Sequence, residues 1–129
     1  HVADLIKELT RADKVIGFNI ENFDYEVLHG YSPISLRDYP TLDLMADIED
    51  TLGHRLSLES VATATIGAPK IADGLVALKW WKEGKLLEIA EYCCFDVKIT
   101  KEVHEYGQKY GEVAYMDRQG QRRVVKVKW

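Results

Sequence analysis

The stretch KVIGFNIENFD, residues 14–24, decides the fold class of this chain. Its first five residues form a short apolar run that is typical of a β-strand, and the run ends at Asn19. Apolar residues at helical spacing follow and end at Gly30, so this segment predicts a helix directly after the strand. A strand that passes through a short turn into a helix is typical of α/β proteins.

The segments on either side extend this pattern and predict a single α/β domain over residues 1–129 that ends in a β-hairpin. Apolar residues at helical spacing indicate the helices, and short apolar or alternating runs indicate the strands. The predicted elements are helices over residues 2–10, 57–64 and 85–110, strands over residues 41–45, 112–116 and 122–129, and a turn over residues 117–120 between the last two strands.

The composition is that of a globular protein, because 47% of the 129 residues are hydrophobic and 29% are charged. A chain of this length suffices for one domain with its own core. It contains no run of about 20 apolar residues, so we expect no membrane-spanning segment. The two cysteines, Cys93 and Cys94, are adjacent and form no disulfide framework, so we expect a reducing, cytoplasmic environment.

The charge balance excludes the capture of nucleic acid by bulk positive charge. The chain has 17 Lys and Arg residues and 21 Asp and Glu residues, which gives a formal net charge of −4. A protein that captures DNA or RNA mainly by electrostatic attraction is basic. An enzyme that meets phosphates through bound metal ions is not excluded, because the ions supply positive charge locally.

Asp24 is the first candidate functional residue, because it follows the predicted strand at the strand-to-helix turn. Sites in α/β proteins lie at the carboxyl ends of strands. A structural role is also open, since an acidic residue in the first turn of a helix interacts favourably with the helix macrodipole. The stretch by itself does not decide between these two roles.

A second candidate pair, Tyr92 and Asp96, lies in the run YCCFD within the long predicted helix. Residues four apart project from the same helix face. The residues around Asp96 are apolar, so the run predicts a largely buried surface that this carboxylate interrupts. A buried carboxylate is costly unless it is paired or coordinates a metal ion. Two roles are therefore open for Asp96: metal binding, or a salt bridge with a lysine such as Lys98 or Lys101.

Together, the runs GFNIENFD (residues 17–24) and YCCFD (residues 92–96) resemble the second and third motifs of the DnaQ-like 3′–5′ exonucleases. These enzymes are a branch of the ribonuclease H-like superfamily, and Tyr92 places the resemblance in their tyrosine subclass. The first run is similar to the version in the proofreading domains of family-B DNA polymerases. Residues 78–97 and the hairpin after them are similar to the carboxyl end of the YprB-like proteins, which are helicase-associated. The resemblance implies a ribonuclease H-like fold.

The resemblance also implies roles for five residues. Asp24 and Asp96 are catalytic residues and two of four carboxylates that bind two Mg²⁺ or Mn²⁺ ions. Tyr92 is the third catalytic residue of this chain and orients the attacking water with its hydroxyl group. Asn19 and Phe23 are similar to residues that contact the single-stranded 3′ end of DNA or RNA, where a Phe ring stacks on a base. In phosphodiester cleavage, two hard cations such as Mg²⁺ or Mn²⁺, about 3.5–4 Å apart, activate the attacking water and stabilise the leaving oxygen. We therefore expect Asp24, Tyr92 and Asp96 to converge.

The first motif of the family, Asp-x-Glu on a strand, is absent from this chain, and so are two further strands that accompany it. We therefore expect a ribonuclease H-like fold without its first three strands, and the start at His1 predicts a piece of a longer protein. The only Asp-x-Glu, residues 47–49, follows the second motif, and we interpret it as a solvated helix start. The strand at residues 14–18 then has an unpaired edge, which predicts a homo-oligomer through this edge or marginal stability.

The sequence thus predicts a portion of a metal-dependent 3′–5′ exonuclease that is inactive on its own. The alternative is a non-catalytic ribonuclease H-like module that binds nucleic acid or a partner and is associated with a helicase. An Asp-x-Glu on a β-type run shortly before His1 would favour the enzyme.

Two other features are predicted to be structural. The tryptophans of KWWK, residues 79–82, are expected to pack the long helix onto the domain rather than to bind a strand of nucleic acid. His29, His54 and His104 have no metal-ligand spacing and are expected to have surface or capping roles.

Overall fold

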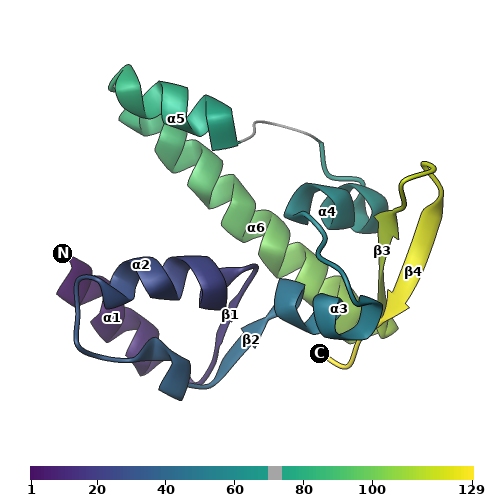
Figure 1. Ribbon diagram of the computed structural model, residues 1–129, viewed down its shortest axis with the longest axis horizontal. Helices are drawn as coiled ribbons and strands as arrows, with labels where there is room; N and C mark the ends of the chain where they lie inside the picture. The colour runs from purple at the N-terminus through teal and green to yellow at the C-terminus, as the bar shows by residue number, and fades with distance from the viewer. Residues whose placement is uncertain (70–73) are drawn as a thin grey trace. The chain divides into compact units, whose positions relative to one another are not determined.

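The structure is a computed structural model, and it describes residues 1–69 and 74–129 (Figure 1). It divides into two compact units, His1–Arg55 and Leu56–Trp129, which we call the N-terminal unit and the C-terminal unit and describe separately. Both units combine helices with strands, so the predicted α/β class is confirmed. The single partial domain over residues 1–129 and the ribonuclease H-like fold stay predictions.

The N-terminal unit contains two short parallel strands joined by a helical crossover. Its elements are α1 (Val2–Arg11), β1 (Val15–Gly17), the π-helical turn η1 (Ile20–Asp24), α2 (Tyr25–His29), the 3₁₀ turn η2 (Leu36–Asp38), β2 (Thr41–Asp43) and α3 (Leu44–Leu52). In the strand pair, Val15 lies opposite Thr41 and Gly17 lies opposite Asp43. A parallel pair needs such a crossover, because a tight hairpin joins only antiparallel strands.

Both strands of this unit are shorter than predicted. The strand expected over residues 14–18 spans Val15–Gly17, and the strand expected over residues 41–45 ends at Asp43, where α3 begins. The Asp43 carboxylate accepts hydrogen bonds from the backbone N–H groups of Met45 and Ala46 and so caps α3. A short apolar run is compatible with strand or helix, and here the capping residue decides where the strand ends.

The core of the N-terminal unit is a small apolar cluster between its helices. Its buried members are Ile6 of α1, Tyr25 of α2 and Leu36 of η2. The helix predicted over residues 2–10 is confirmed, and its apolar face supplies Ile6. Around these three residues pack the partly buried side chains of Val2, Leu9, Val15, Ile20, Leu28 and Tyr39.

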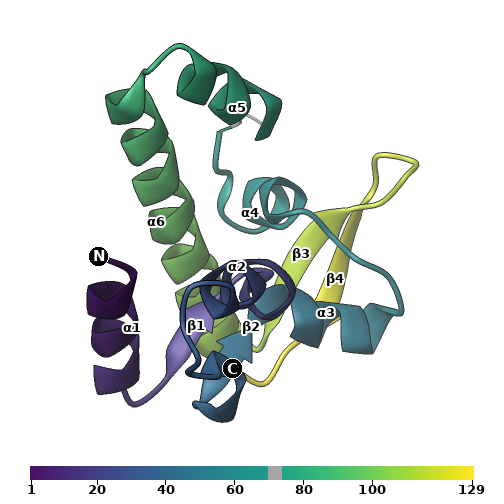
Figure 2. The same ribbon diagram turned by 60° about the vertical axis from the view of Figure 1, so that its left-hand side comes forward.

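The C-terminal unit is a set of helices beside an antiparallel hairpin. Its elements are α4 (Leu58–Ile66), α5 (Gly74–Lys82), α6 (Leu86–Tyr110), β3 (Glu112–Met116) and β4 (Arg122–Lys126). Figures 1 and 2 both show α4 beside β3, and α5 against the first half of α6. Ser57 caps α4 by accepting a hydrogen bond from Ser60, so the predicted helix start is confirmed. The predicted long helix and hairpin are also confirmed, although β4 ends at Lys126 and not at residue 129.

Asp117 organises the hairpin turn. Its Oδ1 accepts hydrogen bonds of 2.9 Å from the backbone N–H groups of Gln119 and Gln121, and Gly120 adopts a positive φ of 76°. The carboxylate also pairs with Arg123 at 2.9 Å, and this pair holds the pKa of Asp117 below its usual value. Local polar contacts therefore close the turn that the sequence predicts over residues 117–120.

The C-terminal unit closes around α6 at Gly107. A Cβ atom at this position would lie 2.3 Å from a ring carbon of Trp129, so only glycine permits the contact. The buried hydrophobic residues of the unit come from α4, α6 and the hairpin segment: Val61, Ala62, Ile99, Val103, Val113, Ala114, Val125 and Val127.

The two tryptophans of the KWWK run have different environments. The Trp80 ring packs edge-on against Tyr92 of α6, with ring centroids 6.3 Å apart. Trp81 is 66% exposed, so the prediction that both tryptophans pack the long helix is wrong for Trp81. Adjacent residues of a helix point about 100° apart, so a helix that packs on one side covers only one of them.

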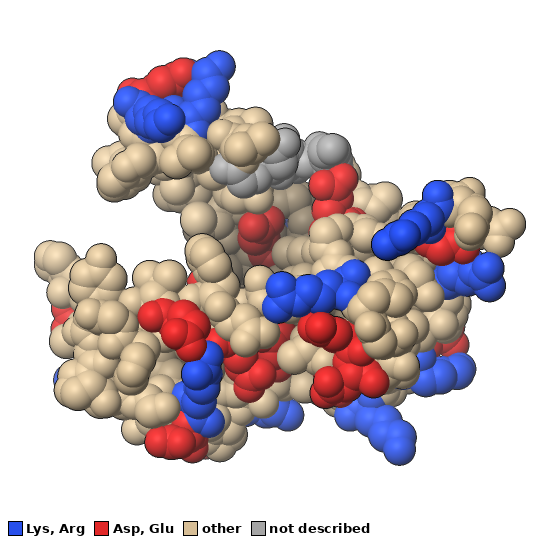
Figure 3. Space-filling view, in the orientation of Figure 1, with Lys and Arg blue, Asp and Glu red and all other residues tan. Residues whose placement is uncertain are grey.

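The molecular surface has mixed charge. Figure 3 shows basic and acidic side chains side by side, and Arg37 pairs with Glu26, Lys85 with Glu83, and Lys126 with Glu112. Within residues 1–69 and 74–129, no helix has both the length and the apolar character that a membrane crossing requires.

Candidate metal and substrate site

The turn that follows β1 depends on two residues with special backbone requirements. A Cβ atom on Gly17 would lie 2.4 Å from the Ile20 side chain, so the close approach of these residues needs glycine. Asn19 adopts the left-handed conformation, with φ of 60°. Asparagine tolerates this region better than most residues do. The run GFN therefore directs the chain from β1 into η1, at whose end Asp24 lies.

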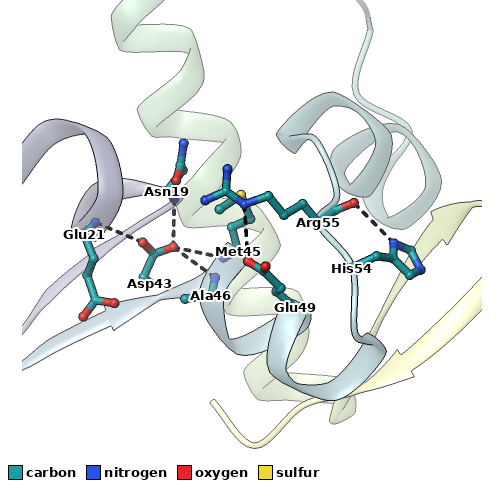
Figure 4. Close-up of polar contacts among 8 residues, drawn as sticks. All are labelled: Asn19, Glu21, Asp43, Met45, Ala46, Glu49, His54 and Arg55. Atoms are coloured by element: carbon teal, nitrogen blue, oxygen red, sulfur yellow. Dashed lines mark hydrogen bonds and ion pairs between the residues drawn. The ribbon is translucent and has the colours of Figure 1, made fainter.

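Asp43 holds this turn from the end of β2, and Figure 4 shows its contacts. Its carboxylate is buried, with 4% of the residue exposed. Oδ1 accepts hydrogen bonds from the backbone N–H groups of Asn19 at 2.8 Å, Met45 at 3.1 Å and Ala46 at 3.3 Å, and Oδ2 accepts one from Glu21 at 3.1 Å. Sequence reasoning missed Asp43. An Asp directly before a helical run indicates an N-cap. The residues next to Asp43 in the sequence do not indicate that it also accepts hydrogen bonds from residues 19 and 21.

Two further contacts hold the segment that carries Asp24. Arg37 donates a hydrogen bond of 3.0 Å to the carbonyl oxygen of Glu21 and pairs with Glu26. The hydroxyl groups of Tyr25 and Thr41 lie 2.8 Å apart. Together with Asp43, these contacts restrain the residues on both sides of Asp24.

The Asp24 side chain is not used as a helix cap. The residue is exposed overall, and it makes no side-chain hydrogen bond to α2. Its carboxyl group is nevertheless partly withdrawn from water, and this desolvation raises its pKa above the usual value. The negative charge of Asp43 raises the pKa further, while the backbone N–H of Asp24 itself acts in the opposite direction. A side-chain cap does not account for this carboxylate, and its interaction with the macrodipole of α2 stays a prediction.

The two predicted substrate residues flank the same turn. Phe23 is 62% exposed, so its ring is open to solvent for stacking. The side-chain oxygen Oδ1 of Asn19 is buried and has no hydrogen-bond partner within the described residues. Buried polar atoms normally have a partner, so this oxygen needs an explanation. A role of these residues in binding a 3′ end stays a prediction.

Tyr92 and Asp96 lie one helical turn apart on α6, as predicted, and both are partly buried. Desolvation raises the pKa of Asp96 above its usual value. Within the described residues, no salt bridge joins Asp96 to Lys98 or Lys101, and Lys101 pairs with Glu105 at 3.9 Å. The alternative of a lysine-paired Asp96 is therefore not realised.

The prediction of a largely buried surface around Asp96 is wrong. Cys93 and Cys94 are exposed, and Val97 is 70% exposed. The fully buried positions of α6 lie in its second half, from Ile99 to Gly107. Apolar residue types do not show how much of a helix circumference is covered, and this depends on which elements pack on it.

The structure forms each half of the predicted site within one unit. Asn19, Phe23 and Asp24 belong to the N-terminal unit, and Tyr92 and Asp96 belong to the C-terminal unit. Their convergence stays a prediction.

A metal ion needs several donor side chains that face one point. Within residues 1–69 and 74–129, no group of three or more His, Cys, Asp and Glu side chains is arranged to hold a metal ion. Carboxylate oxygens suit Mg²⁺ and Mn²⁺, and a metal site shared by Asp24 and Asp96 stays a prediction.

The Asp-x-Glu run at residues 47–49 has structural contacts in α3. Asp47 lies in the first turn of this helix, and Glu49 pairs with Arg55 at 3.4 Å (Figure 4). The acidic pair is therefore placed on a helix and not on a strand.

Comparison with known proteins does not assign the chain to a family. No family model matches it, and neither a curated protein nor a solved structure does. The structure defines a mixed α/β chain. Its N-terminal unit contains a strand-to-helix turn held by Asp43, and its C-terminal unit contains helices and a hairpin.

Proposed function

We propose that residues 1–129 are a portion of a metal-dependent 3′–5′ exonuclease of the ribonuclease H-like superfamily, which hydrolyses phosphodiester bonds of DNA or RNA. The observation that carries this proposal is the state of the two motif carboxylates. Asp24 and Asp96 are both partly desolvated, and neither is taken up by a helix cap or a salt bridge within the described residues. Carboxylates of this kind are candidates for functional sites.

The proposed residues have distinct tasks. Asp24 and Asp96 would hold Mg²⁺ or Mn²⁺ together with carboxylates outside this chain, and the ions would supply the positive charge that phosphodiester cleavage needs. The Tyr92 hydroxyl would orient the attacking water. The Asn19 amide and the exposed Phe23 ring would bind the terminal nucleotides of a single strand.

This chain alone is expected to have no appreciable nuclease activity. Two carboxylates hold one hard cation weakly, because such an ion keeps most of its waters. A second ion at the short spacing of a two-ion centre needs bridging ligands, and the described residues do not bring such a group together. Loss of this preorganised charge removes the largest contribution to the rate.

The test uses a 3′-labelled single-stranded oligonucleotide with Mn²⁺, incubated with this chain and with the longer protein that we expect to contain it. We expect cleavage by the longer protein, loss of cleavage in its Asp96→Asn variant, and no cleavage by residues 1–129. The exposed Asp50→Asn is the matched control and should keep full activity. Cleavage by residues 1–129 that is lost in Asp47→Asn would overturn the assignment of the carboxylates.

A non-catalytic ribonuclease H-like module is the second candidate. It is favoured by the small acidic donor set, since the described residues contain no group of three metal-ligating side chains. Such a module would bind single-stranded nucleic acid or a helicase without hydrolysis. Binding of the oligonucleotide by the longer protein, with no cleavage in Mg²⁺ or Mn²⁺, would support this candidate over the enzyme.

A further inference from the structure

The two oxygens of the buried Asp43 carboxylate have different partners. Oδ1 bonds the first turn of α3 through Met45 and Ala46, and it also bonds the N–H of Asn19. Among the described residues, Oδ2 accepts a hydrogen bond from the N–H of Glu21 alone, at 3.1 Å. One side chain therefore joins the start of α3 to the turn that presents Asn19 and leads to Asp24.

We infer that Asp43 is a positioning residue that fixes the Asn19–Glu21 turn and, through it, the placement of Asn19 and Asp24. This inference rests on the proposed function, in which those two side chains bind the 3′ end and the metal ion. Asp43 itself is not assigned as a ligand, because the residue is buried and both of its carboxylate oxygens accept backbone hydrogen bonds.

The geometry explains why a carboxylate is needed at this position. Both oxygens face backbone donors, so both must be acceptors. An asparagine keeps one carbonyl oxygen and remains a good N-cap for α3. The NH₂ group of the asparagine would replace Oδ2 and would face the N–H of Glu21. Two donors cannot bond each other, so the hydrogen bond from Glu21 would be lost. Asp43→Asn therefore removes the Glu21 contact and keeps the Asn19 contact and the cap of α3, whereas Asp43→Ala removes all of them.

The first readout is amide hydrogen exchange measured by NMR on the complete 129-residue chain. In Asp43→Asn we expect exchange at Glu21 to become about tenfold faster, because a hydrogen bond to a charged acceptor is lost. Exchange at Met45 and Ala46 should change little. In Asp43→Ala all of these amides should exchange faster. The control Asp50→Asn removes one exposed charge from the same helix and should leave Glu21 unchanged. Unchanged exchange at Glu21 in Asp43→Asn would overturn the inference.

The second readout is paramagnetic broadening of the Asp24 resonances by Mn²⁺, which loss of the α3 cap alone would not alter. We expect the Mn²⁺ concentration for half-broadening to rise several-fold in Asp43→Asn and to stay unchanged in Asp50→Asn. Equal broadening in Asp43→Asn and the unmodified chain would overturn the positioning of Asp24 by Asp43. Absence of broadening in every protein would instead contradict the metal site of the proposed function, and the exchange rate of Glu21 would still decide whether Asp43 holds the turn.

Discussion

The two strand pairs of this protein differ in how their edges are treated. In the C-terminal unit, α4 covers the outer edge of β3: the Thr65 hydroxyl donates to the carbonyl of Ala114 at 3.0 Å and accepts from its N–H at 2.9 Å. In the N-terminal unit, β2 is the only strand paired with β1 among the described residues. The hydrogen bond from the Val15 N–H to Pro40 shows that Val15 faces β2, so the backbone groups of Ile16 point away from it.

The outer edge of β3 is therefore closed by α4 at Ala114, whereas one edge of β1 has no paired strand among the described residues. An unpaired edge is a template for another strand. Four predictions test this comparison.

The largest effect is expected for Thr65→Val, which removes the hydroxyl that serves both backbone groups of Ala114. Two buried polar groups then lose their partner, so we expect the free energy of unfolding to fall by about 2–4 kcal/mol. Urea denaturation measures this change. Thr63→Val on the same helix is the matched control, because Thr63 is exposed and its loss should change stability by less than about 0.5 kcal/mol. Equal effects of the two variants would show that the edge of β3 is not closed by Thr65.

Gly107→Ala tests how the C-terminal unit closes around α6. The added methyl group would collide with the Trp129 ring, so we expect a loss of about 1–3 kcal/mol in the free energy of unfolding. In a Trp129→Ala background the same change should become neutral or stabilising, because alanine favours helix more than glycine does. A double-mutant cycle from thermal unfolding measures the coupling. Additive effects would contradict the contact.

The unpaired edge of β1 should be visible in solution. We expect the chain to self-associate through this edge or to be only marginally stable. If the chain associates, Ile16→Lys should weaken the association by about tenfold, because a lysine at a strand edge opposes strand pairing. Sedimentation measures the effect, and Val27→Lys on α2 is the control, because Val27 is an exposed valine on a helix and not on a strand edge. A monomer with a high melting temperature would contradict the prediction.

The smallest effects concern pH, and they have opposite signs at Asp24 and Asp117. The pKa of Asp24 is raised in the folded state above its usual value of 3.8, so the ionisation of Asp24 opposes folding. The free energy of unfolding therefore falls as the pH rises above 3.8. Asp24→Asn should therefore stabilise the chain at pH 7 and have no effect well below pH 3.8.

The pKa of Asp117 is lowered in the folded state, so the stabilisation by its carboxylate is present at pH 7 and is lost as pH falls below 3.8. Asp117→Asn should lower the free energy of unfolding at pH 7. Urea denaturation at several pH values between 3 and 7 measures the effects of both variants.

The sequence by itself determined the features that depend on neighbouring residues. The helical spacing of residues 85–110 predicts α6, Ser57 marks the start of α4, and the polar run at residues 117–120 predicts the hairpin turn. These elements arise from hydrogen bonds and side-chain positions within a few residues, so local patterns contain the information.

Only the tertiary structure decided the contacts that define the candidate site and the strand edges. Asp43 reaches Asn19, which is 24 residues away, and Thr65 reaches Ala114, which is 49 residues away. The exposure of Trp81 and Val97 likewise follows from which helix faces receive a neighbour. A hydrogen bond or a buried surface needs two groups brought together by the whole fold, and one partner's residue type specifies neither the other partner nor its distance.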